Sequence, residues 1–261
     1  MKTESLVQQL FQHLVSGRRA KATEFVSGLR ETGLSAEALA NDIFWPLHEM
    51  LVKLHKHGQL ARLHYNYATR LLRQIAHTSA TAYTRGPART ERVLMFCGPT
   101  EGEELGAQLA VDLLESSGFE VYFGGAGVAN DEVLGELNDL RPNFLVMWAS
   151  AAQDAPAIRQ LIDTVREING HPGMKIVCGG GVFNRAPGLS EEIGAAATAS
   201  TPASLVTTLV NINQAKDTRT AKGARSGSTV VETKGGIGVG GANSSSTSAG
   251  AKSATRRRAV T

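Results

Sequence analysis

Between residues 93 and 198 the sequence alternates short apolar runs with longer amphipathic stretches, and this alternation constrains the fold more than any other feature. Four apolar runs, VLMF (93–96), VYF (121–123), FLVMW (144–148) and KIV (175–177), alternate with helical stretches at 103–117, 131–140, 155–168 and 189–193. A fifth strand around 196–198 and a last helix over 202–212 complete five βα units. Such a repeat predicts an α/β fold with a parallel sheet covered on both faces by helices.

The ligand crevice of such a sheet lies at the carboxyl ends of the strands, where the winding direction switches. Three loops follow strands at that edge, at 98–104, 149–154 and 179–184. We therefore expect a small-molecule site to be built from these loops.

Residues 1–85 carry helical periodicity and almost no strand signal. Leucines recur every four residues near the start of the chain, and Ser35 is placed to cap a helix over 36–44. Pro46 suits the first turn of the next helix, which Gly58 ends. Short helices joined by tight turns predict an all-α bundle over 1–85, and the polar run 85–89 predicts a linker to a sheet domain over 91–212.

The C-terminal segment, residues 213–261, is rich in Gly, Ser, Thr, Ala and Lys. It cannot bury enough apolar surface to offset the entropy of ordering, so we predict a disordered tail. Its last 48 residues hold nine Lys or Arg against two acidic residues, whereas the rest of the chain holds 18 basic against 22 acidic ones. Weak, non-specific contact with nucleic acid is therefore expected from the tail alone. A G-x-G-x-x-G match at 236–241 has no βαβ unit around it and does not predict a nucleotide loop.

Cysteine content and apolar run length bear on the compartment. The chain has only Cys97 and Cys178, which form neither a disulfide framework nor a zinc spacing. No apolar run approaches the roughly 20 residues needed to cross a bilayer, and the first residues lack the pattern of a signal peptide. We expect a cytoplasmic protein without membrane insertion.

The loop after the first strand places three acidic residues at the start of a predicted helix. Thr100-x-x-Glu103 is a capping box, in which the Thr100 hydroxyl accepts from the Glu103 amide and the Glu103 carboxylate accepts from the Thr100 amide. Glu101 and Glu104 suit the positive end of the helix dipole. We expect capping to be the main role of Glu103, and the crowded negative charge disfavours a phosphate site at this helix.

Three segments of the sheet region stand in a distinctive order: Glu101–Gly106 follows the first predicted strand, Ser150 the third and Gly179–Gly181 the fourth. This order resembles that of cobalamin-binding domains. Those domains carry D-x-H-x-x-G after the first strand, a serine loop about forty residues later after the third, and a Gly-Gly pair after the fourth. The helical cap of the family carries a Trp and, after nine residues, Glu-His, and here these positions read His55, Tyr65 and Asn66.

This resemblance implies a flavodoxin-like, doubly wound, five-stranded sheet behind a helical cap, with cobalamin or another corrinoid as the cofactor. In the family, a histidine binds cobalt from below and an aspartate orients it. Glu103 stands at the histidine position, and a carboxylate is a harder and weaker donor than imidazole toward cobalt. We therefore expect a divergent member without histidine ligation of cobalt and without a protein metal site. The implied cofactor-binding residues are Thr100, Glu101, Glu103, Gly106, Ser150, Gly179, Gly180, Gly181, His55, Tyr65 and Asn66.

Several residues near the crevice also have structural interpretations. The glycines at 179–181 suit a sharp turn as well as the close approach of a ligand, and both interpretations stay open. Trp148 is expected in the core rather than in a pocket wall. Both cysteines lack a neighbouring cation in the sequence and are expected to act as small apolar side chains. The spacing of the histidines at 48, 55, 57 and 64 matches no zinc pattern.

Three functions compete on this sequence. The first is a non-catalytic sensory or regulatory module that binds a corrinoid or another small molecule. The second is a degenerate cobalamin-binding fold that acts as an interaction module for a partner protein, and the third and weakest is a flavin- or nucleotide-dependent enzyme. Because no nucleophile, base and orienting group can be assembled from the crevice loops, we expect no catalytic residues and no enzyme.

Overall fold

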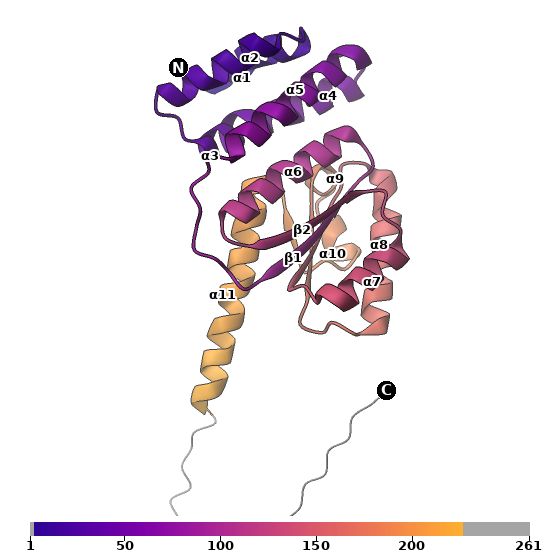
Figure 1. The fold of residues 1–261 in the computed structure, drawn as a ribbon. Coiled ribbons are helices and arrows are strands. Elements are labelled where there is room, and N and C mark those ends of the chain that lie inside the picture. Colours follow the sequence, from indigo (N-terminus) through magenta and orange to yellow (C-terminus); the bar gives the residue numbers. More distant parts are fainter. Residues whose placement is uncertain (1–2, 227–261) are drawn as a thin grey trace, which may run out of the picture. The chain divides into compact units, whose positions relative to one another are not determined.

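The computed structural model describes residues 3–226, with side chains up to residue 215. Helices come first along the chain (Figure 1): α1 (Thr3–Val15), α2 (Arg19–Glu31), α3 (Ala36–Ala38), the π-helix η1 (Leu39–Phe44), α4 (Trp45–Lys56) and α5 (Arg62–Ala80). Ser35 caps α3 by accepting from the Ala38 amide at 3.1 Å, and Pro46 lies in the first turn of α4, as predicted. The single helix predicted over 36–44 is instead one α-helical turn continued as a π-helix.

A five-stranded parallel sheet follows, in the order β2-β1-β3-β4-β5. Its strands are β1 (Arg92–Cys97), β2 (Glu120–Ala126), β3 (Phe144–Trp148), β4 (Lys175–Gly179) and β5 (Ala197–Ala199). The winding direction changes between β1 and β3, which places the topological switch point after Cys97 and Trp148. The predicted flavodoxin-like, doubly wound α/β fold class is confirmed.

Helices cover the two faces of the sheet, and each face has its own apolar cluster. One cluster joins the helical bundle, α6 and the first part of α11 to alternate strand residues such as Val93, Met95 and Val146. The other joins α7, α8 and α9 to the intervening residues, such as Leu94 and Leu145. These helices are α6 (Glu101–Ser116), α7 (Asn130–Leu140), η2 (Ala152–Asp154), α8 (Ala155–Ile168), α9 (Gly181–Arg185), α10 (Leu189–Glu192) and α11 (Pro202–Ser226).

The bundle shares its core with one face of the sheet. Leu10 and Leu72 of the bundle are fully buried in the same cluster as Met95 of β1. Across this boundary the rings of Trp45 and Trp148 meet edge to face, with their centroids 5.8 Å apart. The bundle is therefore packed directly above the residues that the sequence assigns to the site.

Three boundaries differ from the sequence prediction. Helix α11 runs to Ser226 instead of ending at residue 212, because the segment after Ile212 contains Gln, Ala, Lys and Arg, which favour helix. Whether a disordered tail follows stays a prediction, because residues 227–261, with the G-x-G-x-x-G match, lie outside the described residues. Strand β2 is longer than predicted, and the loop after β4 contains the short helix α9. Within the described part of the chain, no helix is long and apolar enough to cross a membrane.

Candidate functional site

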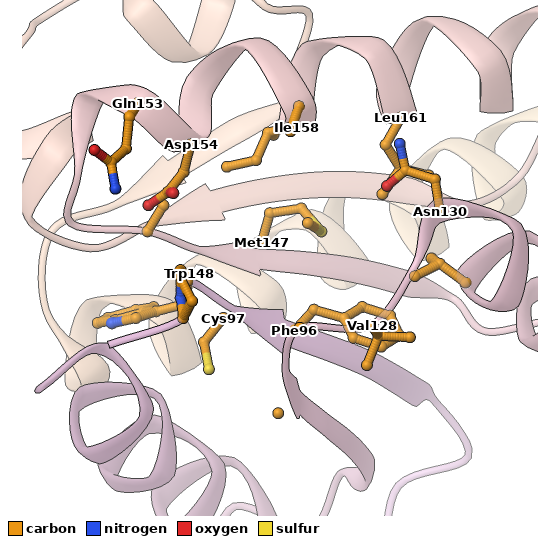
Figure 2. Close-up of a pocket in the computed structure, with 17 residues that line it drawn as sticks. Phe96, Cys97, Val128, Asn130, Met147, Trp148, Gln153, Asp154, Ile158 and Leu161 are labelled. Atoms are coloured by element: carbon orange, nitrogen blue, oxygen red, sulfur yellow. The ribbon is translucent and has the colours of Figure 1, made fainter. Parts of the chain in front are cut away.

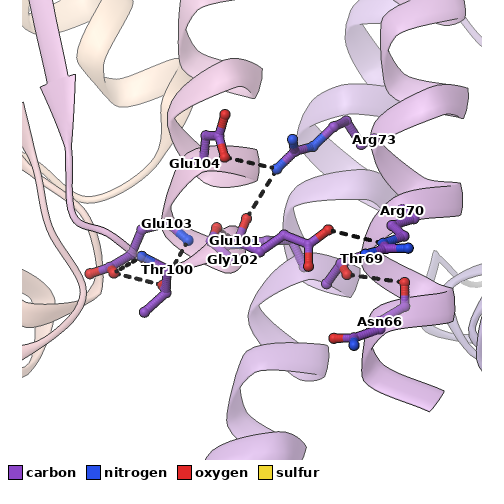
Figure 3. Close-up of polar contacts among 10 residues, drawn as sticks. Asn66, Thr69, Arg70, Arg73, Thr100, Glu101, Gly102, Glu103 and Glu104 are labelled. Carbon is purple, nitrogen blue, oxygen red and sulfur yellow. Dashed lines mark hydrogen bonds and ion pairs between the residues drawn. The ribbon is translucent and has the colours of Figure 1, made fainter. Parts of the chain in front are cut away.

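Thr100 and Glu103 form the predicted capping box at the start of α6 (Figure 3). The Thr100 hydroxyl oxygen accepts from the Glu103 amide at 3.2 Å, and Glu103 Oε2 accepts from the Thr100 amide at 3.2 Å. The same carboxylate oxygen also accepts from the Thr100 hydroxyl at 2.6 Å. The sequence pattern therefore predicted this local structure correctly.

Glu103 also links two loops that are far apart in the sequence. Its second oxygen, Oε1, accepts from the amides of Ser150 at 2.5 Å and Ala151 at 3.1 Å, so the buried carboxylate ties the loop after β1 to the loop after β3. Gly98 makes room for it, because a Cβ atom there would lie 2.6 Å from the Glu103 carboxyl carbon. With the capping bonds, both oxygens of Glu103 are engaged by the protein itself.

Helix α5 of the bundle is anchored on the first turn of α6 (Figure 3). Arg73 donates to the Glu101 carbonyl and to Glu104 Oε2, both at 3.4 Å, and Arg70 lies 3.8 Å from Glu101 Oε1. From α4, His48 Nε2 lies 2.6 Å from the Gly102 carbonyl, which can only accept, so Nε2 carries the proton. Two bundle helices thus contact the turn that carries Glu103.

A cavity of about 400 Å³, called here the bundle-side cavity, lies between α4, α5 and the strand ends. The rings of His55 and Tyr65 stack in it, 4.2 Å apart with an interplanar angle of 10°. His55 Nδ1 donates to the Leu60 carbonyl at 3.0 Å, which leaves Nε2 as the acceptor. Burial, together with Glu101 and Glu103, raises the pKa of Tyr65 to about 12. The lining residues are Val52, His55, Lys56, Arg62, Tyr65, Asn66, Pro99, Thr100, Glu101, Glu103, Ser150 and Ala151.

The structure brings together seven of the eleven residues singled out from the sequence. They are His55, Tyr65, Asn66, Thr100, Glu101, Glu103 and Ser150, all in the wall of the bundle-side cavity. Their convergence from four segments supports the location inferred from the motifs. Whether they bind a cofactor stays a prediction.

The motif glycines Gly106, Gly179 and Gly180 lie elsewhere, packed against buried groups. A Cβ atom on Gly106 would lie 3.1 Å from Trp148 Nε1 and 3.1 Å from His48 Cε1. A Cβ atom on Gly179 would lie 2.6 Å from Trp148 Cε3, and Gly180 has a left-handed φ of +97° against the Ala149 backbone. The space beside these glycines is thus filled by the chain itself, chiefly by Trp148.

A smaller cavity of about 180 Å³, the switch-point cavity, opens beside the ends of β1 and β3 (Figure 2). Trp148 is only 1% exposed, which agrees with the predicted core position, but it also lines this cavity, so the core and the pocket wall are not alternatives for this residue. Burial, with Glu104 and Glu103 nearby, raises the pKa of the Cys97 thiol to about 12, and burial raises that of Cys178 to about 12. Because both thiols are protonated at neutral pH, neither cysteine is prepared to act as a nucleophile. Burial and the neighbouring Glu103 also raise the pKa of Asp154, another residue in the wall of this cavity.

A third cavity, of about 620 Å³, adjoins the bundle-side cavity and shares Val52, Lys56 and Ser150 with it. We call it the cationic cavity, because Lys53 and Lys56 of α4 and Arg185 of α9 line it. The sequence did not point to it, since its cations come from segments more than 100 residues apart and form no local motif. Of the predicted site residues, Gly181 lines this cavity and Ser150 lines both this one and the bundle-side cavity. The other lining residues are Trp45, His48, Glu49, Met50 and His57.

Comparisons with known proteins point to one family. Residues 91–206 match the family model of the B12 binding domain. The monomethylamine corrinoid protein of Methanosarcina barkeri has the same fold, with a TM-score of 0.70, 17% sequence identity, and coverage of 80% of this chain and 99% of that protein. No curated protein sequence matches the chain.

Two further structures are more distant. A cobalamin-binding protein of Desulfitobacterium hafniense has a TM-score of 0.41 and 14% sequence identity, with coverage of 78% of this chain and 97% of that protein. The methanol:cobalamin methyltransferase complex of Methanosarcina barkeri has a TM-score of 0.43 and 17% sequence identity, with coverage of 80% of this chain and 79% of the matched chain. The resemblance inferred from the motifs is confirmed for residues 91–206, and B12 is the cofactor that the description of the matched family names.

The polar groups of the bundle-side cavity fit a corrin ring, but Glu103 does not fit its cobalt ion. The bundle-side cavity offers hydrogen-bonding groups from Arg62, Tyr65 and Asn66, which suit the amide groups around a corrin ring. Glu103 does not fit as a cobalt ligand, because four hydrogen bonds already engage its two oxygens. A metal bond at Glu103 would leave buried amides without partners.

Proposed function

We propose that this chain, whose residues 91–206 belong to the B12-binding domain family, is a non-catalytic sensory or regulatory module. It holds a corrinoid between the helical bundle and the strand ends, without a cobalt ligand from the loop after β1. The observation that carries this proposal is the Glu103 carboxylate, which stands at the histidine position of the family and is saturated by four protein donors.

The chemistry around the cavities supports a binding role rather than catalysis. Both thiols have raised pKa values, and His48 and His55 each donate to a backbone carbonyl. A base with a nucleophile within reach is the usual signature of covalent catalysis. We also propose a reducing, cytoplasmic location, which the two free cysteines support.

The test is the visible spectrum of the full chain after incubation with hydroxocobalamin and desalting. We expect wild-type protein to retain the corrinoid without the spectral change that protein-imidazole ligation causes. The double variant Glu101→Asp, Glu103→His restores an imidazole and its orienting carboxylate and should produce that change. Glu104→His is the matched control, because it makes the same substitution one residue away at a side chain that pairs with Arg73 and lies outside the cavity wall.

Two outcomes would contradict the proposal. Wild-type protein that already shows an imidazole-ligated spectrum would mean that another histidine, such as His55, reaches cobalt. Folded wild-type and double-variant proteins that both stay colourless would mean that no corrinoid enters.

If both proteins stay colourless, the interaction-module alternative is favoured. One observation already supports that alternative: Leu63 and Tyr67, one turn apart on α5, are 57% and 42% exposed. Large apolar side chains grouped on a surface commonly mark contact with another protein. In that case the double variant Leu63→Ser, Tyr67→Ser should weaken association with a partner and leave folding unchanged.

A further inference from the structure

The cationic cavity has an excess of positive charge that the described part of the chain does not neutralise. Lys53, Lys56 and Arg185 line it, and among the side chains up to residue 215 none of the three forms an ion pair with a carboxylate. Glu49 is the one acidic residue in the cavity wall, and burial raises its pKa.

Two of these cations converge on a single neutral atom. Lys56 Nζ donates to the Ser150 carbonyl at 3.3 Å, and the Arg185 guanidinium donates to the same oxygen. The two like charges repel, and burial and Arg185 lower the pKa of Lys56, although Glu103 and Asp154 act in the opposite direction. An anion between the two side chains would relieve this repulsion and accept the hydrogen bonds that the carbonyl now shares.

We propose that the cationic cavity binds a phosphate ester, with Lys53, Lys56 and Arg185 as the anion-recognising residues. Arginine and lysine together are a usual phosphate-binding set, and three positive charges match a phosphate better than a single carboxylate. This inference rests on the proposed function to the extent that the phosphate is the one in the nucleotide tail of a cobalamin. A free phosphate ester is the other source of the same chemistry.

The experiment compares three probes on the full chain, with tryptophan fluorescence and calorimetry as readouts. Hydroxocobalamin carries the nucleotide tail, cobinamide lacks it, and inorganic phosphate is the anion alone. We expect cobinamide to bind about ten- to a hundredfold more weakly than hydroxocobalamin, the range for charge-assisted hydrogen bonds. Inorganic phosphate should change the emission of Trp45, which lines the cavity.

The double variant Lys56→Gln, Arg185→Gln should lose the preference for hydroxocobalamin and the response to phosphate. Lys21→Gln, which removes one positive charge from the exposed pair on α2, is the control and should change neither. Far-UV circular dichroism reports whether each variant is folded. If the double variant does not fold, the single variants Lys53→Gln and Lys56→Gln, both at exposed positions, test whether these cations recognise the phosphate.

The possible failures are distinguishable. Equal affinities for the two corrinoids, unchanged in the double variant, would overturn the phosphate site and leave corrinoid binding intact. A response to phosphate without binding of either corrinoid would support the phosphate site and contradict the proposed function. Phosphate binding that the double variant retains would show that these cations do not form the site.

Discussion

The buried carboxylate of Glu103 accepts four hydrogen bonds from two loops, and this arrangement determines what the residue can do. Three of the donors are backbone amides, which cannot turn to find other partners. A buried donor that loses its acceptor costs about 1–3 kcal/mol. Glu103 therefore acts here as a structural link between the strand ends.

Glu103→Gln tests this link. The amide keeps the size of the side chain, but its NH₂ group must face a donor, so we expect the free energy of unfolding to fall by about 2–3 kcal/mol. Glu101→Gln removes the same charge from the same helix turn at a partly exposed side chain and should cost less than about 0.5 kcal/mol. Urea denaturation measures both. Equal losses would mean that charge at the helix start matters and the cross-link does not.

His48 gives the fold a pH dependence of its own. Burial lowers the pKa of His48 to about 4, whereas an unfolded histidine has a pKa near 6.5. The unfolded state therefore binds the extra proton between these values, and this contribution to stability is present above pH 6.5 and lost progressively as the pH falls to 4.

The His48→Gln variant keeps a donor for the Gly102 carbonyl but does not titrate. The difference in unfolding free energy between wild type and this variant should shift against wild type by about 2–3 kcal/mol from pH 7 to pH 4. Denaturation at a series of pH values isolates this contribution, because the carboxylates titrate in both proteins. A constant difference would mean that His48 is not buried as a neutral imidazole.

At the scale of elements, the strands and the first cap were predictable because their signals are local. Apolar runs of three to five residues located all the long strands, and the three-residue spacing of Thr100 and Glu103 predicted the capping box. The end of α11 and the switch from α- to π-helix at Leu39 were missed, since both depend on small differences in helix preference and packing.

The cross-links within the site could not be predicted in the same way. Glu103 meets Ser150 across 47 residues, and Lys56 meets the same residue across 94. No spacing rule relates such pairs, because only the order of the strands brings them together. The motifs therefore predicted a location for the site, whereas the side chains that line the cavities there depend on the fold.

The turn between β4 and α9 shows which motif glycine the backbone requires. Gly180 has a φ of +97°, and a Cβ atom there would overlap the Ala149 backbone, so Gly180→Ala should lower the free energy of unfolding by about 2–4 kcal/mol. Gly173→Ala is the control, since nothing lies within 4 Å of its Cβ position and its φ is not left-handed. Thermal melts compare the two. A mild effect of Gly180→Ala would favour close approach of a ligand over backbone geometry as the reason for this glycine.

For the folded unit as a whole, the shared core bears on the division into domains. Bundle leucines, α6 and one face of β1 and β3 belong to one apolar cluster, while α7 and α8 form the other cluster across the sheet. The boundaries at 1–85 and 91–212 stay a prediction about the chain. Energetically, the shared cluster favours unfolding of the bundle and the sheet together, because separating them would expose buried residues such as Trp45 and Trp148.

A pair of core truncations on opposite sides of the sheet tests that cooperativity. Leu10 in α1 belongs to the cluster shared with the bundle, and Leu161 in α8 belongs to the other, and both are at most 1% exposed. Each Leu→Ala substitution should lower the free energy of unfolding by about 3 kcal/mol. If the unit is cooperative, each should shift the urea midpoints of tryptophan fluorescence and far-UV circular dichroism equally. If Leu10→Ala instead makes the far-UV circular dichroism transition biphasic, the bundle unfolds before the sheet, and the cap and the sheet are separate folding units.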